Sequence, residues 1–142
     1  MTRYLLDTNV VSNLTKPAPP PGLLAWMGER TDAELYISTI TLAEIARGVL
    51  EAPEGKRRRD LQAWFDGPSG PQALFAGRVL TFDEPSALVW ARLMSEGRAA
   101  RQTRSAIDVM IAAIAVVSGC IVVTANARHF EGVAPFIDPG AD

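Results

Sequence analysis

The stretch YLLDTNVVSNL, residues 4–14, determines how this chain begins to fold. Its leading residues predict a short buried strand over residues 3–6, which ends at Asp7. Asp7, Thr8 and Asn9 are typical of turns and helix caps, so a helix is expected to start just after them. A carboxylate, a hydroxyl and an amide therefore stand between two segments that belong in a core.

The rest of the chain alternates between strand and helix patterns. Further strands are predicted at residues 34–38, 78–83 and 120–126, which are rich in aromatic and β-branched residues. Helices are predicted at residues 22–30, 39–55, 56–65, 84–100 and 105–119, with a loop over residues 66–72 and a polar tail after residue 126. This alternation predicts a single α/β domain over residues 1–142, with a mainly parallel sheet and helices on both faces.

Composition limits the class of protein. Of the 142 residues 48% are hydrophobic, the formal net charge is −2, and the only cysteine is Cys120. The overall charge gives no case for nucleic-acid binding, although a local basic patch can hide within it. One cysteine excludes an internal disulfide and fits a reducing cytoplasm. No signal peptide is expected, and no run approaches the roughly 18–20 apolar residues that span a bilayer, so we expect a cytoplasmic protein that is not in a membrane.

Three carboxylates stand where a core would not normally place them. Asp7 and Asn126 lie at the carboxyl ends of the first and last predicted strands, the edge at which open α/β sheets bind ligands. Glu44 is flanked by Ala43 and Ile45, and it is either a solvated helix position or a pocket residue. Asp108 lies in the nearly apolar helix 105–119, where it is either a first-turn residue favoured by the helix dipole or a ligand.

One acidic pocket would explain all three carboxylates. Like charges gathered together repel each other, and a divalent cation relieves that repulsion. Mg²⁺ and Mn²⁺ prefer oxygen ligands, whereas one His and one Cys in the whole chain exclude a typical zinc cluster.

Four segments carry a resemblance to a known family. YLLDTNVVS, TLAEIARG, SAIDVMIAAIA and IVVTANARHF, in this order and spacing, resemble the PIN-domain ribonucleases, and more closely the VapC-type toxins of type II toxin–antitoxin systems in the FitB-like subgroup. The resemblance extends from residue 4 to about residue 139. It implies a three-layer α/β/α sandwich and a metal-dependent endoribonuclease, with Mg²⁺ as the cofactor and Mn²⁺ as a second candidate. The matching catalytic and metal-binding residues are Asp7, Glu44 and Asp108.

The end of the last strand departs from the family pattern. The family commonly carries a further carboxylate here, whereas this chain has TANARHF, with Asn126 and His129 at the two candidate positions. Asn126 can offer a carbonyl oxygen to the metal. His129 is a weak ligand, a phosphate contact or a surface residue. Thr8, Asn9 and Thr124 are expected either to orient the carboxylates or the phosphate, or to serve only as turn and cap residues.

The remaining expectations concern partners and alternatives. Arg98, Arg101 and Arg104, which precede Asp108, are the predicted RNA-binding residues together with Arg47. The resemblance implies a VapB-like antitoxin, a homodimer and a toxin–antitoxin hetero-oligomer. Two alternatives stay open: an inactive PIN-like binding module that lacks the fourth acid, and an aspartyl phosphohydrolase, which would need a second Asp where Asn9 stands.

Overall fold

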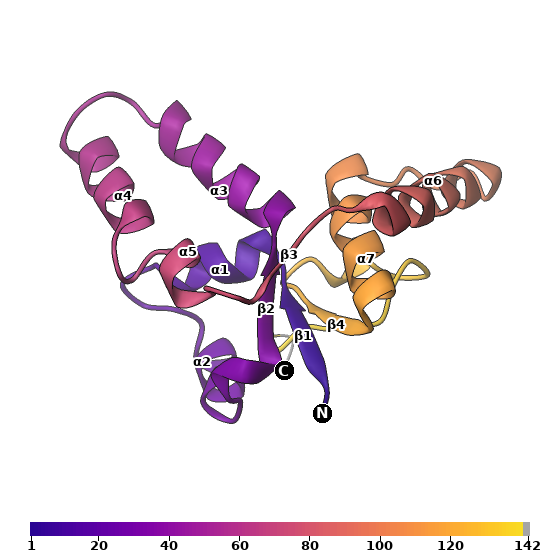
Figure 1. The fold of residues 1–142 in the computed structure, drawn as a ribbon, viewed down its shortest axis with the longest axis horizontal. Helices are drawn as coiled ribbons and strands as arrows, with labels where there is room; N and C mark the ends of the chain where they lie inside the picture. Colours follow the sequence, from indigo (N-terminus) through magenta and orange to yellow (C-terminus); the bar gives the residue numbers. More distant parts are fainter. Residues whose placement is uncertain (141–142) are drawn as a thin grey trace.

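A five-stranded parallel sheet forms the centre of the molecule (Figure 1). The computed structural model describes residues 1–140, and the strands lie in the order β3-β2-β1-β4-β5. They are β1 (Arg3–Leu6), β2 (Leu35–Ser38), β3 (Val79–Leu80), β4 (Cys120–Val123) and β5 (Phe136–Ile137). All four neighbouring pairs are parallel, as the alternation of strands and helices predicts.

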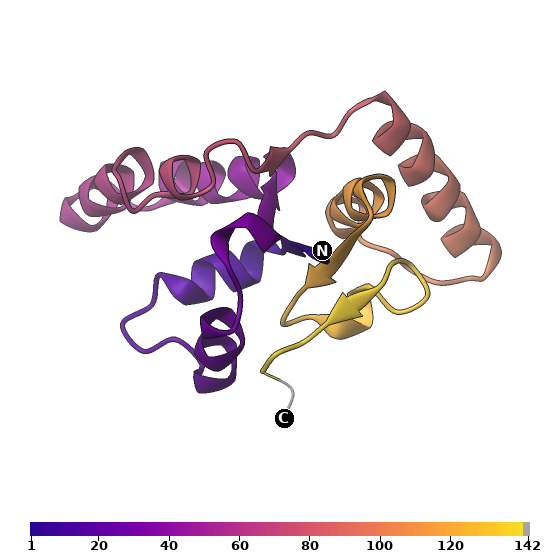
Figure 2. The same cartoon turned by 60° about the horizontal axis from the view of Figure 1, so that its bottom comes forward.

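Helices cover both faces of this sheet, which confirms the three-layer α/β/α architecture. The helices are α1 (Thr8–Leu14), α2 (Pro21–Gly28), α3 (Thr39–Glu51), α4 (Lys56–Asp66), α5 (Pro71–Leu74), α6 (Glu84–Ala99) and α7 (Ala106–Ser118). Helices α1 to α5 lie on one side, and α6 and α7 lie on the other (Figures 1 and 2). No helix within residues 1–140 has the length and apolarity that crossing a bilayer requires.

Two separate cores result from the alternation of side chains along the strands. Leu5 and Val122 are fully buried against α6 and α7, whereas their neighbours Leu6 and Val123 are fully buried against the helices of the other face. Helix α7 is nearly apolar all round, and six of its thirteen residues are buried between the sheet and α6. It ends at Gly119, whose φ of 68° places the backbone in the left-handed region that glycine tolerates.

Two short elements differ from the prediction. The segment after residue 126, expected to be a polar tail, contains the 3₁₀ turn Ala127–His129 and strand β5. The expected loop over residues 66–72 leads into α5, which starts at Pro71. Elements of two to four residues have no measurable periodicity, and β5 exists because it pairs with Val122 and Val123 of β4. The predicted strands at 78–83 and 120–126 are also shorter, since each ends before its polar residues.

The strand register brings three strand ends to one edge of the sheet. Leu6 of β1 lies opposite Val123 of β4, and Leu5 lies opposite Tyr36 of β2. The residues that follow these strands therefore lie side by side. The strand order reverses between β1 and β4, and this point is where open α/β sheets form a crevice outside their carboxyl ends.

Candidate active site

An acidic pocket with a volume of about 410 Å³ opens at this point of strand reversal. Nine side chains line it: Asp7, Thr8, Asn9, Ser12, Asn13, Lys16, Glu44, Asp108 and Asn126. The three predicted carboxylates and the predicted amide thus come from four different elements and meet in one pocket. Glu44 is half-buried at its wall, so it is not the solvated helix position that the sequence left open.

Asp7 forms the floor of the acidic pocket. It is the N-cap of α1, and its side chain is held by three donors: the Thr8 backbone N–H at 2.8 Å, the Thr124 hydroxyl at 2.9 Å and the Asn9 amide at 3.3 Å. The residue is only 3% exposed. This burial raises the pKa of Asp7 to about 6, against the lowering effect of the Thr124 and Thr8 hydrogen bonds and with a further contribution from the nearby carboxylates.

Glu44 is fixed to the start of α1 by Thr8. The Thr8 hydroxyl donates to Glu44 Oε1 at 2.5 Å and lies 3.0 Å from the hydroxyl of Thr41. Helix α3 begins directly after β2, because the Ser38 hydroxyl accepts a hydrogen bond from the Thr41 N–H at 3.1 Å. Two strand-to-helix junctions therefore hold Glu44 and Asp7 in the same pocket.

Asp108 is both a first-turn residue of α7 and a pocket residue. Ser105 caps the helix by accepting a hydrogen bond from the Asp108 N–H at 3.3 Å. The carboxylate is 20% exposed, and its Oδ2 lies 2.7 Å from His129 Nδ1. His129 is thus an exposed residue that contacts one oxygen of Asp108, and the other oxygen of Asp108 has no hydrogen-bond partner within residues 1–140.

The residues that follow β4, Thr124 to Asn126, complete the pocket. Thr124 is fully buried, donates to Asp7 and accepts from the Asn126 N–H at 2.9 Å. Asn9 Oδ1 accepts from the Ala125 N–H at 3.1 Å, which ties this segment to α1. The geometry of Thr8, Asn9 and Thr124 thus agrees with orienting roles as well as with caps and turns.

The donor set of the pocket suits a hard divalent cation. Its candidate ligands are carboxylate and amide oxygens, and Asp7 makes no ion pair with any residue of the described chain. Within residues 1–140, no three His, Cys, Asp or Glu side chains converge closely enough to enclose a metal by themselves. Mg²⁺ does not need such an enclosure, since it binds through one or two carboxylates and takes its other ligands from water and phosphate.

Three lining residues were not predicted: Ser12, Asn13 and Lys16. Ser12 and Asn13 have a signal in the sequence, because they share one helix face with Asn9, whereas Val10 and Val11 are core positions of the same helix. Lys16 brings a positive charge to the rim of an otherwise acidic pocket.

The predicted RNA-binding arginines are placed differently from one another. Arg47 is exposed and pairs with Glu51 at 2.7 Å, and it does not line the acidic pocket. Arg98 and Arg101 are exposed and also lie outside the lining. Arg104 lines a second pocket, beside the first. RNA contact by all four, Arg47, Arg98, Arg101 and Arg104, stays a prediction.

The fold and this pocket define a three-layer α/β/α protein with an acidic, oxygen-lined site at the switch point of a parallel sheet. The model of the PIN domain matches residues 4–134, so the chain belongs to the PIN domain family and the resemblance is confirmed. The VapC ribonuclease Y4jK of Sinorhizobium fredii is 39% identical over 127 residues, with 89% of each chain covered. The toxin FitB of Neisseria gonorrhoeae is 36% identical over 126 residues, again with 89% of each covered.

A solved structure supports the same assignment. The crystal structure of FitAcB from Neisseria gonorrhoeae matches this fold with a TM-score of 0.87 and 32% identity, covering 98% of this chain and 99% of that one. The match includes the sheet edge that carries the acidic pocket, because nearly the whole chain is covered.

Proposed function

We propose that this protein is a metal-dependent endoribonuclease that acts as the toxin of a toxin–antitoxin pair. The observation that carries the proposal is the convergence of Asp7, Glu44 and Asp108 on one pocket. The family membership supports it, as do relatives that are a VapC ribonuclease and a toxin at 39% and 36% identity.

Asp7 and Asp108 would hold the cation, with Glu44 and Asn126 as further oxygen donors, and Mg²⁺ is the expected ion with Mn²⁺ as the alternative. When bound, the cation supplies Lewis-acid polarisation of the phosphodiester and lowers the pKa of the attacking water.

The chain's own residues prepare this chemistry before any ligand arrives. Thr124 and the Thr8 backbone fix the Asp7 carboxylate, the Thr8 hydroxyl fixes Glu44, and His129 fixes Asp108. Carboxylates that are already oriented need little reorganisation when charge develops on the phosphate. Lys16, at the rim of the same pocket, would face the negative charge of the scissile phosphate.

The acidic pocket also suggests how an antitoxin would neutralise the protein. Three carboxylates against one lysine leave the pocket negatively charged in the absence of cations. A VapB-like antitoxin would offer a basic side chain to this pocket and so exclude both cation and RNA. A homodimer, a toxin–antitoxin hetero-oligomer and a cytoplasmic location remain part of the proposal.

Incubation of the purified protein with single-stranded RNA in Mg²⁺, in Mn²⁺ or in EDTA tests the proposal. We expect cleavage with either metal and none in EDTA. If neither ion binds in a calorimetric titration and no RNA is cut, the chain is an inactive binding module instead.

The aspartyl phosphohydrolase alternative predicts a different product. Lys16 would suit it, but Asn9 occupies the position of the second Asp and donates its amide to Asp7. A phosphoprotein trapped with a phosphate mimic would favour that alternative over the ribonuclease.

A further inference from the structure

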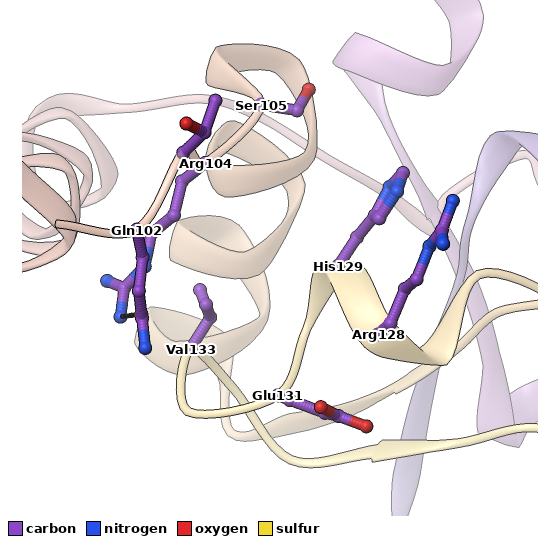
Figure 3. Close-up of a pocket in the computed structure, with 8 residues that line it drawn as sticks. Gln102, Arg104, Ser105, Arg128, His129, Glu131 and Val133 are labelled. Atoms are coloured by element: carbon purple, nitrogen blue, oxygen red, sulfur yellow. Dashed lines mark hydrogen bonds between the residues drawn. The ribbon is translucent and has the colours of Figure 1, made fainter. Parts of the chain in front are cut away.

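Figure 3 shows a second pocket, which has a volume of about 560 Å³. It lies beside the acidic pocket, because His129 in its lining contacts Asp108. One wall is the segment that leads from α6 into α7, and the other is the 3₁₀ turn Ala127–His129 with the residues that follow it. The proposed catalytic role of the acidic pocket does not use this second pocket.

The two pockets share a wall. His129 lines the second pocket, Asp108 lines the acidic pocket, and their side chains meet at 2.7 Å. Ser105 lines the second pocket and caps the helix turn that carries Asp108. A flexible ligand that reaches the acidic pocket can therefore continue across this contact into the second pocket.

The charge of the second pocket is opposite to that of the first. Two guanidinium groups line it, from Arg104 and Arg128, against the single carboxylate of Glu131. In Figure 3 the side chain of Glu131 points away from those of Arg128 and His129, which lie next to each other. A phosphate would be repelled by the carboxylates of the first pocket but attracted by the second.

The two arginines have different tasks. The Arg104 guanidinium donates to the Leu93 carbonyl at 2.6 Å and to Gln102 Oε1 at 3.0 Å, so it holds the wall in shape. Its stem passes directly over Gly97, where a Cβ would come within 2.6 Å of Arg104 Cδ. Arg128, in contrast, is exposed and forms no ion pair within residues 1–140. Arg128 is thus the cation that is free to bind a ligand.

We propose that the second pocket is a subsite for one unpaired ribonucleotide that neighbours the scissile phosphate, and this inference rests on the proposed ribonuclease function. Arg128 binds the phosphate of that nucleotide, and the ring of His129 together with Val133 offers a face for its base. The polar side chains of Gln102, Thr103 and Ser105 line the same pocket and can bond a base edge or a 2′-hydroxyl. The preferred substrate is then a single-stranded segment, because a paired base cannot enter.

The test measures RNA binding apart from cleavage. In an Asp7→Asn background, the affinity for a short fluorescein-labelled single-stranded RNA of mixed sequence is measured by anisotropy over a range of salt concentrations. Arg128→Gln is expected to weaken binding about three- to tenfold and to reduce the salt slope by about one ion. Arg59→Gln, which removes the same charge from α4 on the other face of the sheet, is the matched control and should change neither quantity.

Cross-linking with a 4-thiouridine-labelled RNA gives a second measurement that does not depend on the variant. Cross-links are expected in the peptides that contain residues 102–105 and 128–133. Equal affinity of the Arg128→Gln and Arg59→Gln proteins, with cross-links elsewhere, would overturn the subsite. An Arg128→Gln protein that loses only a protein partner, and not RNA, would overturn it too. Binding that depends on Arg128 without any cleavage by the wild type would instead uphold the subsite and contradict the ribonuclease function.

Discussion

The protonation state of Asp7 matters most for the acidic pocket. Burial raises its pKa from 3.8 to about 6, and the neighbouring carboxylates add to the effect. Between these two values the folded protein holds a proton that the unfolded chain has already released. Asp7 therefore makes the free energy of unfolding fall as the pH rises from about 4 to about 6. Above about pH 6 the full loss of stability from the buried, ionised carboxylate remains. A bound cation would remove this cost by replacing the proton.

The first prediction concerns the stability of an Asp7→Asn protein without divalent ions. At pH 7.5 we expect it to be more stable than the wild type by about 1–3 kcal/mol, because an amide needs no proton or cation to be neutral. Below about pH 4 the advantage should disappear, since the wild-type carboxyl is then protonated in both states. Urea unfolding at both pH values measures this.

A wild-type protein that is more stable than Asp7→Asn at pH 7.5 in EDTA would show that Asp7 is not buried as an uncompensated charge. Addition of Mg²⁺ supplies the internal control. It should stabilise the wild type and leave the variant unchanged.

At the scale of elements, the junction between β1 and α1 does most to build the site. The strand delivers Asp7 to the sheet edge, and the first turn of the helix supplies the groups that orient it. Thr8 then reaches across to α3, where its hydroxyl bonds Glu44 and approaches Thr41. Thr8 thus binds both carboxylates, Asp7 through its backbone N–H and Glu44 through its hydroxyl.

The second prediction is that Thr8→Val lowers metal-dependent cleavage by about tenfold while changing the stability by no more than about 1–2 kcal/mol. Valine keeps the shape of the side chain but releases Glu44, so the affinity for the metal should fall as well. Thr15→Val is the matched control, because its hydroxyl caps the exposed end of α1 by donating to the Ser12 carbonyl at 2.7 Å. Equal loss of activity in both variants would mean that the Thr8–Glu44 contact has no special role.

The elements with clear periodicity could be predicted from the sequence. The strand at residues 3–6, helix α6 and helix α7, which carries Asp108, occur where their patterns indicate. Strand β5 could not be predicted, because its two residues are held by pairing with β4 rather than by any local preference.

The candidate site could be predicted only where its residues interrupt a clear pattern in the sequence. Asp7, Glu44 and Asp108 stand out because each breaks an apolar pattern. Lys16 does not, since a polar residue at a helix end needs no explanation. The contact between His129 and Asp108 joins residues 21 positions apart, and only the folded chain brings them together.

At the scale of the whole molecule, charge is divided between two neighbouring pockets. The net charge of −2 gives no sign of nucleic-acid binding, because the acidic pocket and the arginines of the second pocket offset each other in the total. Under the two proposals this division gives the pockets separate tasks: the carboxylates would hold a cation at the scissile phosphate, and the guanidinium of Arg128 would hold the next nucleotide. A polyanion can therefore bind to a protein that is acidic overall.

The most direct test of the account is RNA cleavage by Asp7→Asn and Asp108→Asn proteins in Mg²⁺, beside the wild type. Asp60→Asn, which removes an exposed carboxylate that pairs with Lys56 on α4, is the matched control. We expect both pocket variants to lose at least about a hundredfold in rate, because each removes a carboxylate that would hold the cation, whereas the control keeps the wild-type rate. Since Asp7→Asn should be the more stable protein in the absence of divalent ions, unfolding would not explain its loss. Cleavage at the wild-type rate by either pocket variant, or by the wild type in EDTA, would contradict the account.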